Sequence, residues 1–185
     1  MTEKEKCRAG MLYDANNDQD LIRERNQCKD LCQQYNQLTN SQAEKKKEIL
    51  QKIIGNCGED FVIEPNFWCD YGYNISFGKN FYANHNLVIL DCAEVRFGDH
   101  VFIGPNCNFY TAGHPLDAET RNKGLEFAKS ITVGNNVWFG GNVTVLPGIS
   151  IGDNAVIGAG SVVTKDIPAF AVAAGNPCKV IKMLE

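Results

Sequence analysis

Apolar and polar residues follow two different periods along the chain, and the period changes near residue 56. In residues 1–55 the apolar positions recur every three or four residues, as in an amphipathic helix, at Leu21, Cys28, Leu31, Cys32, Tyr35 and Leu38. A second helical stripe follows at Ile49, Leu50, Ile53 and Ile54. Ser41 and Glu44 have the spacing of a capping box at its start. We therefore predict a small N-terminal α-helical hairpin domain over residues 1–56.

From residue 60 onward the period becomes six. Residues 131–166 divide without a gap into the hexads ITVGNN, VWFGGN, VTVLPG, ISIGDN, AVIGAG and SVVTKD. The first position is aliphatic or small, the third is apolar, and the fourth is usually glycine. Blocks starting at Ile75, Val95 and Val101 keep this register. A hexapeptide repeat is the signature of a β-helix solenoid, in which three hexads make one triangular coil with the first position inward.

The predicted fold is therefore mainly β, a left-handed parallel β-helix over residues 57–185 that follows the helical domain. Left-handed winding is a property of short-coil hexad solenoids and an exception to the right-handed crossover rule. Asparagine or glycine at the corners tolerates the positive φ of a tight turn. Residues 112–130 break the register and predict a loop that projects from one coil.

Charge and composition limit the kinds of partner that the protein is expected to bind. The net charge is −4, with 18 basic and 22 acidic residues, which argues against a nucleic-acid partner. No stretch approaches the length of a membrane span and no apolar run follows the N-terminus, so we expect a cytoplasmic protein without a membrane partner. The eight cysteines are scattered without a CxxC pair. We interpret them as free thiols that pack as small hydrophobes, and expect no zinc knuckle.

Histidine is the natural general base near neutral pH, and the chain has three. His114 follows Gly113 at the root of the projecting loop. His100 occupies the last position of a hexad, where a solvated corner residue is expected. His85 lies beside Asn84 and suits a packing role or a substrate contact equally. A zinc enzyme of carbonic anhydrase type would need all three histidines together, and the corner position of His100 argues against any metal.

Five segments resemble the maltose and galactoside O-acetyltransferases of the hexapeptide-repeat acyltransferase superfamily. They are YDAN at 13–16, FYANHN at 81–86, TAGHPL at 111–116, and the two stretches 156–168 and 174–181. The resemblance covers almost the whole chain. It implies transfer of an acetyl group from acetyl-CoA to a hydroxyl of a small sugar such as maltose, glucose or a galactoside. It also implies a homotrimer with active sites between subunits.

The resemblance assigns roles to individual residues. His114 becomes the catalytic base, and Glu126 could accept a hydrogen bond from its second ring nitrogen. The acceptor sugar would be bound by Asp14, Asp70, Tyr82, Asn84 and Asp91. Coenzyme A would be bound by Trp138, Gly141, Ala159, Thr164, Lys165, Lys179 and Lys182. Some relatives have serine in place of Asp70, and some have a second acid in place of Cys92, so the choice of sugar stays open. Relatives often have serine in place of Gly141 and arginine near the last two lysines, so Gly141 would act through its backbone and the lysines through charge without bidentate geometry.

Two other functions fit the same repeat. One is acetyl transfer to a non-sugar acceptor, such as an amino acid, an antibiotic or a nucleotide sugar, although such relatives lack the helical start. The other is a structural solenoid without catalysis, which would not need the His114 loop or the partly basic C-terminal tail. No serine or cysteine of the chain is placed beside a base as a covalent nucleophile, so for the acetyltransferase we expect direct transfer in a ternary complex.

Overall fold

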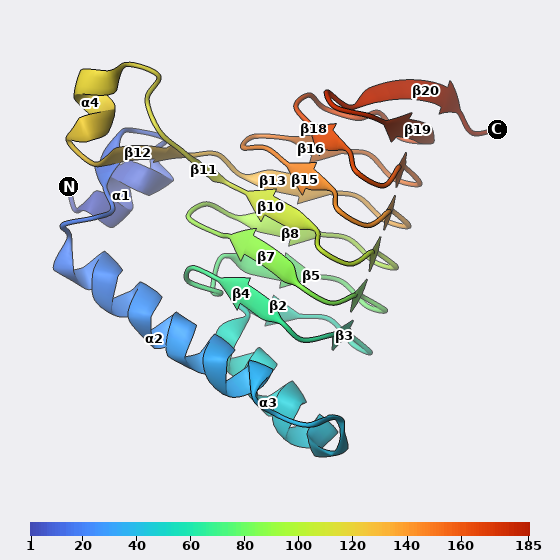
Figure 1. The fold of residues 1–185 in the computed structure, drawn as a ribbon, viewed down its shortest axis with the longest axis horizontal. Helices are drawn as coiled ribbons and strands as arrows, with labels where there is room; N and C mark the ends of the chain where they lie inside the picture. The colour runs from blue at the N-terminus through green and yellow to red at the C-terminus, as the bar shows by residue number, and fades with distance from the viewer.

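The computed structural model describes residues 1–185 as a stack of short parallel strands with helices along one side (Figure 1). The strands form three long parallel sheets, which are the three faces of a triangular solenoid. The predicted hexapeptide-repeat β-helix with an N-terminal helical part is confirmed. None of the helices combines the length and apolar character needed to cross a lipid bilayer.

Each turn of the solenoid contributes one strand to each face. The first face contains β2 (Asn56–Cys57), β5 (Ile75–Phe77), β8 (Val95–Phe97), β13 (Ile131–Val133) and β16 (Ser150–Ile151). The second face contains β3 (Val62–Ile63), β6 (Tyr82–Ala83), β9 (Phe102–Ile103), β14 (Trp138–Phe139), β17 (Val156–Ile157), β19 (Ala171–Ala174) and β20 (Lys179–Met183). The third face contains β4 (Phe67–Cys69), β7 (Leu87–Leu90), β10 (Asn108–Tyr110), β15 (Thr144–Val145) and β18 (Val162–Val163). Within these faces only β19 and β20 pair antiparallel.

The hexad register determines which side chains fill the solenoid. Equivalent positions of successive coils are direct neighbours, so that Ile75 pairs with Val95, and Val95 with Ile131. The first and third positions of the hexads in residues 131–166 are buried and the second position is more exposed, as the period of a strand requires. Stacked aliphatic and aromatic side chains thus form one continuous core, which supplies most of the stabilisation.

The corners use residues that tolerate the left-handed region. The last hexad position has φ near +55° at Asn80, His100, Asn136 and Asn154. Asparagine adopts this conformation more readily than other side chains that carry a Cβ atom. The prediction that these positions form tight corners is confirmed, and His100 lies at such a corner with its side chain exposed.

The N-terminal part contains more elements than the predicted hairpin. They are α1 (Glu3–Arg8), β1 (Tyr13–Asp14), α2 (Gln19–Asn36), the 3₁₀ helix η1 (Asn40–Gln42) and α3 (Ala43–Ile53). The long helix α2 runs beside the solenoid and packs against β4 (Figure 1). The predicted capping box of Ser41 and Glu44 is wrong, because Thr39 and Gln42 make that reciprocal pair two residues earlier.

The projecting segment 112–130 is an ordered structure. It contains β11 (Ala112–Gly113), α4 (Ala118–Asn122) and β12 (Leu125–Ala128). β12 lies between β11 and β1 in a small antiparallel sheet, with Tyr13 paired to Glu126 and Gly113 paired to Phe127. The loop and the N-terminal part, which are a hundred residues apart in sequence, therefore support each other at one end of the molecule (Figure 1).

Candidate active site

The backbone of the projecting segment orients the imidazole of His114. Gly113 precedes it, and a Cβ atom there would lie 2.5 Å from the ring of Phe127, so only glycine fits this close pairing of β11 with β12. His114 Nδ1 lies 3.2 Å from the carbonyl oxygen of Leu125. A carbonyl oxygen can only accept, so Nδ1 carries the proton and Nε2 keeps its lone pair. The side chain is half exposed and open to a substrate.

The sequence suggested that Glu126 accepts a hydrogen bond from the ring nitrogen of His114 that does not act as the base. In the structure Glu126 instead lies near Nε2, the nitrogen with the free lone pair. Its Oε1 is 4.0 Å from Nε2 of His114, whereas Nδ1 is bonded by the backbone. The hydroxyl of Tyr13 donates to Oε2 of Glu126 at 3.2 Å. Burial raises the pKa of Tyr13, so its phenol stays a neutral donor. The carboxylate of Glu126 is thus held close to the nitrogen that would accept a proton.

A polar pocket of about 330 Å³ opens in front of His114 and Glu126. It contains one further residue of the predicted acceptor site, Asp70. The remaining lining residues were not predicted: Asn16, Arg25, Leu90, Cys92, Tyr110, Ala112 and Gly113. Arg25 comes from α2 and its guanidinium donates to the hydroxyl of Tyr71 at 2.8 Å. No sequence motif marks Arg25, because the tertiary fold alone brings α2 to the edge of the pocket.

Asp70 lines this polar pocket, and a second acidic residue, Asp91, is hydrogen-bonded to its backbone without lining the pocket. Asp91 is fully buried, and its Oδ1 accepts hydrogen bonds from the backbone N–H groups of Asp70 and Tyr71 at 3.0 and 2.9 Å. Its Oδ2 has no partner in the chain. Burial raises the pKa of Asp91 to about 7. Burial likewise raises the pKa of Asp70, whose Oδ2 accepts a weak hydrogen bond from the thiol of Cys92 at 3.6 Å.

Asp14 is engaged in a local turn. Its Oδ1 accepts hydrogen bonds from the backbone N–H groups of Asn16 and Asn17 at 3.1 and 3.0 Å, which is an Asx turn. The Asn17 side chain and these backbone bonds lower the pKa of Asp14. Asn16, two residues further along, lines the polar pocket instead. A direct contact of Asp14 with an acceptor stays a prediction.

Three other predicted residues lie around a second depression, on the second face of the solenoid. This aromatic groove has a volume of about 390 Å³ and is lined by Tyr82, Asn84, Phe102, Ile103, Gly104 and Trp138. Tyr82, Phe102 and Trp138 are register neighbours on β6, β9 and β14. Phe102 and Trp138 are half exposed, which is unusual for two neighbouring large aromatic residues. No residue lines both the polar pocket and the aromatic groove.

The corner that contains Gly141, beside the aromatic groove, has backbone N–H groups without a hydrogen-bond partner. At the equivalent position of three other corners, Lys79, Asp99 and Asn135, the backbone N–H donates to a side-chain oxygen of the next coil, as Asn135 does to Asp153 at 2.6 Å. Gly141 is followed in the next coil by Ala159, which has no side-chain acceptor. The amides of Gly141 and Ala159 therefore make no hydrogen bond within the chain. Both were predicted to bind coenzyme A.

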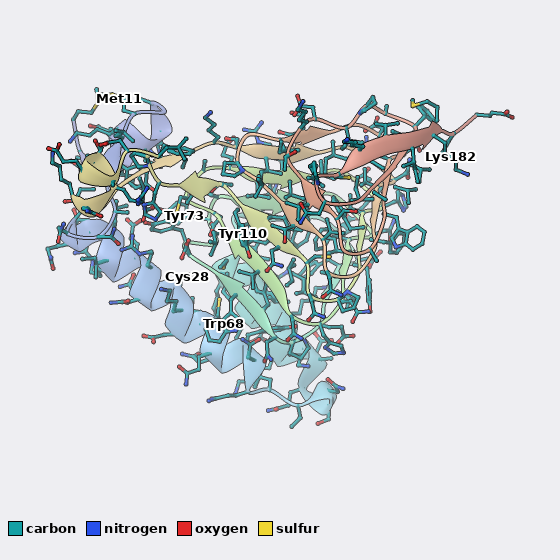
Figure 2. The ribbon with its side chains drawn as sticks, turned by 45° about the horizontal axis from the view of Figure 1, so that its top comes forward. Met11, Cys28, Trp68, Tyr73, Tyr110 and Lys182 are labelled. Atoms are coloured by element: carbon teal, nitrogen blue, oxygen red, sulfur yellow. The ribbon has the colours of Figure 1, made fainter.

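The remaining predicted coenzyme residues lie toward the C-terminus. Thr164 and Lys165 follow β18 and are exposed. Lys179 and Lys182 lie on the outer strand β20, opposite Ala174 and Val172. Figure 2 shows Lys182 at the C-terminal side of the molecule, far from the α1 and α4 end. These residues form a group separate from the polar pocket.

The other two histidines do not join His114. His85 Nδ1 contacts the carbonyl of Pro65, and His100 lies at its own corner. The only group of three metal-ligating side chains in the chain is made of cysteines, Cys28, Cys32 and Cys69. A zinc site of three histidines is therefore not formed within one chain.

Known proteins share both parts of this architecture. Residues 6–58 match the maltose acetyltransferase hexapeptide capping motif, and residues 130–165 match the hexapeptide repeat of succinyl-transferase. The galactoside O-acetyltransferase of Escherichia coli (strain K12) is 44% identical over 182 residues, which cover 98% of this chain and 89% of that relative.

Two solved structures superpose on nearly the whole chain. One is a maltose O-acetyltransferase from Clostridium difficile 630, with a TM-score of 0.98 and 50% identity, covering 100% of this chain and 98% of that chain. The other is a galactoside acetyltransferase in complex with coenzyme A, with a TM-score of 0.97 and 43% identity, covering 100% of this chain and 92% of that chain.

The parallel solenoid and its projecting histidine loop thus define a hexapeptide-repeat acetyltransferase. Within that class, the chain belongs to the maltose/galactoside O-acetyltransferase family. The family resemblance inferred from the five segments is confirmed.

Proposed function

We propose that this acetyltransferase moves the acetyl group of acetyl-CoA to a hydroxyl of a small sugar, with His114 as general base. The observation that carries the proposal is the free Nε2 of His114, fixed by the Leu125 carbonyl at the mouth of a polar pocket. A sugar hydroxyl needs such a base, because it is a poor nucleophile near neutral pH.

The reaction proceeds by direct attack. Nε2 of His114 accepts the proton of the sugar hydroxyl while its oxygen bonds to the thioester carbonyl carbon. The carbon–sulfur bond then breaks, and the imidazolium returns the proton to the leaving thiolate of coenzyme A. The carboxylate of Glu126, 4.0 Å from Nε2, stabilises the imidazolium in between. Tyr13 is a positioning residue that acts through Glu126.

The tetrahedral intermediate and the coenzyme would be held at the corner beside the aromatic groove. The unpaired amide of Gly141 is suited to donate to the oxyanion, and that of Ala159 to the pantetheine arm. Trp138 offers an exposed apolar wall for the same arm. Thr164, Lys165, Lys179 and Lys182 supply hydroxyl and ammonium groups for the phosphates.

The acceptor would lie in the polar pocket. A sugar presents several hydroxyls, each of which can donate and accept, and the pocket supplies both kinds of partner. Asp70 is the acceptor of choice for a sugar hydroxyl, and Arg25 and Asn16 are donors. Buried Asp91 supports Asp70 by accepting a hydrogen bond from the backbone N–H of Asp70.

The separation of the two depressions supports a homotrimer. The polar pocket with His114 lies beyond the end of the third face, whereas Tyr82, Asn84 and Trp138 lie on the second face. A neighbouring copy would bring its aromatic groove to the His114 of this chain and complete the site. We place the enzyme in the cytoplasm, a reducing compartment in which its eight cysteines would persist as thiols.

Release of the coenzyme thiol from acetyl-CoA, measured across maltose, glucose, galactosides and non-sugar acceptors, tests the function. We expect turnover with at least one sugar and none with amino acids or aminoglycosides. Turnover confined to a non-sugar acceptor would overturn the sugar assignment while leaving acetyl transfer intact. Absence of turnover with every acceptor, in a protein that binds coenzyme A, would overturn both.

A further inference from the structure

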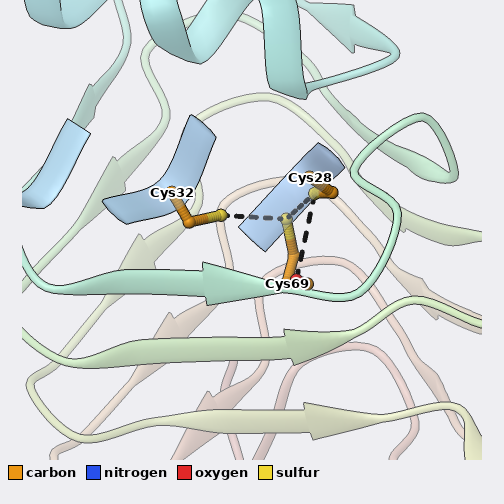
Figure 3. Close-up of side chains that lie close together, drawn as sticks. All are labelled: Cys28, Cys32 and Cys69. Atoms are coloured by element: carbon orange, nitrogen blue, oxygen red, sulfur yellow. Dashed lines mark hydrogen bonds between the residues drawn. The ribbon is translucent and has the colours of Figure 1, made fainter. Parts of the chain in front are cut away.

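A group of buried thiols lies outside the candidate active site. Cys28 and Cys32 are four residues apart on α2 and therefore lie on the same helix face. Cys69 is the last residue of β4, directly below that face (Figure 3). None of the three lines the polar pocket or the aromatic groove. We call these residues the thiol cluster.

The sulfur atoms of the thiol cluster are already arranged as ligands of one ion. Sγ of Cys69 lies 3.4 Å from Sγ of Cys28 and 3.8 Å from Sγ of Cys32, and all three lie within 4.8 Å of one another. Thiolates that share an ion at a metal–sulfur distance of about 2.3 Å are about 3.8–4.0 Å apart. The observed sulfur–sulfur distances thus differ from those of a coordinating triangle by at most about 1 Å.

The two elements that carry the cluster are held in register. The side chain of Asn36 both donates to the carbonyl of Phe67 at 3.0 Å and accepts from its backbone N–H at 2.8 Å. This pair of hydrogen bonds fixes α2 against β4 about one helical turn from Cys32 and two turns from Cys28. The cluster is also closed to solvent, with exposed fractions of 4%, 0% and 3% for Cys28, Cys32 and Cys69. Fixed, dry ligands are what a selective metal site needs.

The number and type of ligand atoms determine which metal ion the thiol cluster can bind. No further histidine, cysteine or carboxylate belongs to the group, so it offers three sulfurs and no fourth ligand. A structural zinc ion is almost always four-coordinate, and this group leaves one position unfilled. Soft thiolates favour copper(I), an ion that accepts three sulfur ligands. We propose that the thiol cluster is a buried three-sulfur site for copper(I), which clamps α2 onto the β-helix.

Binding requires no electron transfer. Copper enters as Cu(I), copper–sulfur bonds form, and the protons of the thiols that become thiolates leave to solvent. The site is independent of acetyl transfer, because no catalytic group contributes a ligand.

The test is an anaerobic titration of the full-length protein with copper(I) in competition with a chromophoric copper(I) chelator. We expect one copper per chain. Cys28→Ala, Cys32→Ala and Cys69→Ala should each weaken binding by about 100-fold or more, since even outer-shell changes cost metal sites 10–100-fold. Cys57→Ala and Cys178→Ala, which remove thiols outside the cluster, serve as controls and should bind copper as the wild type does.

A second measurement covers the case in which a core variant fails to fold. X-ray absorption of the wild-type copper protein should show three sulfur neighbours, and copper(I) should raise the melting temperature. Equal binding by the cluster variants and the controls would overturn the proposal. So would nitrogen or oxygen neighbours at copper, or tighter binding of zinc through the same three cysteines.

Discussion

A single phenol connects the N-terminal strand to the proposed base. Tyr13 and Glu126 face each other across the β1–β12 pair, and the Tyr13 hydroxyl is the only side-chain donor to Glu126. The carboxylate is thereby held toward His114 rather than toward solvent. In the proposed mechanism, catalysis depends on three groups, Tyr13, Glu126 and His114, of which His114 alone contacts the reacting hydroxyl.

Tyr13→Phe removes the hydroxyl and keeps the ring. Because a hydrogen bond to a charged group is worth about 1.5–3 kcal/mol, we expect kcat to fall by roughly 10- to 100-fold with little change in the KM for acetyl-CoA. Tyr35→Phe is the matched control, since Tyr35 is equally buried and donates to the carbonyl of Ile63, away from the site. Equal kcat values for the two variants would mean that Tyr13 has a structural role only.

Asp91 makes stability depend on pH. Its folded pKa of about 7 lies above the ordinary value of 3.8, so the folded state binds this proton more tightly than the unfolded state. The contribution to stability is fully present below about pH 4 and is lost as the pH rises through 7. At 1.36 kcal/mol per pKa unit, the loss amounts to about 4 kcal/mol.

Asp91→Asn keeps an acceptor for the two backbone N–H groups but cannot ionise. We expect the difference in unfolding free energy between the variant and the wild type to shift in favour of the variant between pH 4 and pH 8. Chemical denaturation at several pH values measures it. A difference that is constant over this range would show that Asp91 titrates normally.

At the scale of the elements, the corners decide where each coil turns. Asn80 adopts φ 54° at the end of its hexad, and its side chain makes no hydrogen bond in the chain. Asn80→Ala should lower the unfolding free energy by about 1 kcal/mol, because alanine is strained in the left-handed region, whereas Asn80→Gly should be close to neutral. Thermal melts of the two variants compare them. If both variants lose the same stability, the effect comes from loss of the Asn80 side chain and not from strain in the backbone.

The hexapeptide repeat could be recognised from the sequence because every strand and corner of the solenoid repeats the same six-residue pattern. Residues 131–166 show the inward first and third positions directly, and the corner residues mark the turns. The short elements α1 and β1 were missed, since six or two residues carry no period, and β1 exists through its pairing with β12. The same pairing explains why segment 112–130 was expected only as a loop.

At the scale of the whole molecule, the sequence supplied candidate residues for the site but neither their grouping nor lining residues such as Arg25. His114, Glu126 and Asp70 line one pocket, while Tyr82, Asn84 and Trp138 line another. The thiol cluster was also invisible, because Cys69 lies 37 residues from Cys32 in the chain. Such groupings depend on how coils and helices stack, and no local motif records them.

A mixed oligomer tests whether two copies share each site. His114→Ala and Asn84→Ala should each be inactive alone. If His114 and Asn84 of different copies meet, unfolding and refolding the two variants together in equal amounts should restore about a quarter of wild-type activity, because about one interface in four receives both intact residues. Recovery of no activity, in oligomers shown to be mixed, would place both residues of a site in the same copy.

The central claim is that His114 takes the proton from the acceptor hydroxyl. The measurement that tests it most directly is the turnover of acetyl-CoA by His114→Ala with the best sugar acceptor, together with coenzyme A affinity by calorimetry. His100→Asn, which fills an exposed corner with the residue found at other corners, is the control. We predict a loss of about 100- to 10,000-fold in kcat for His114→Ala with unchanged coenzyme affinity, and wild-type activity for His100→Asn. Substantial turnover by His114→Ala would contradict the account.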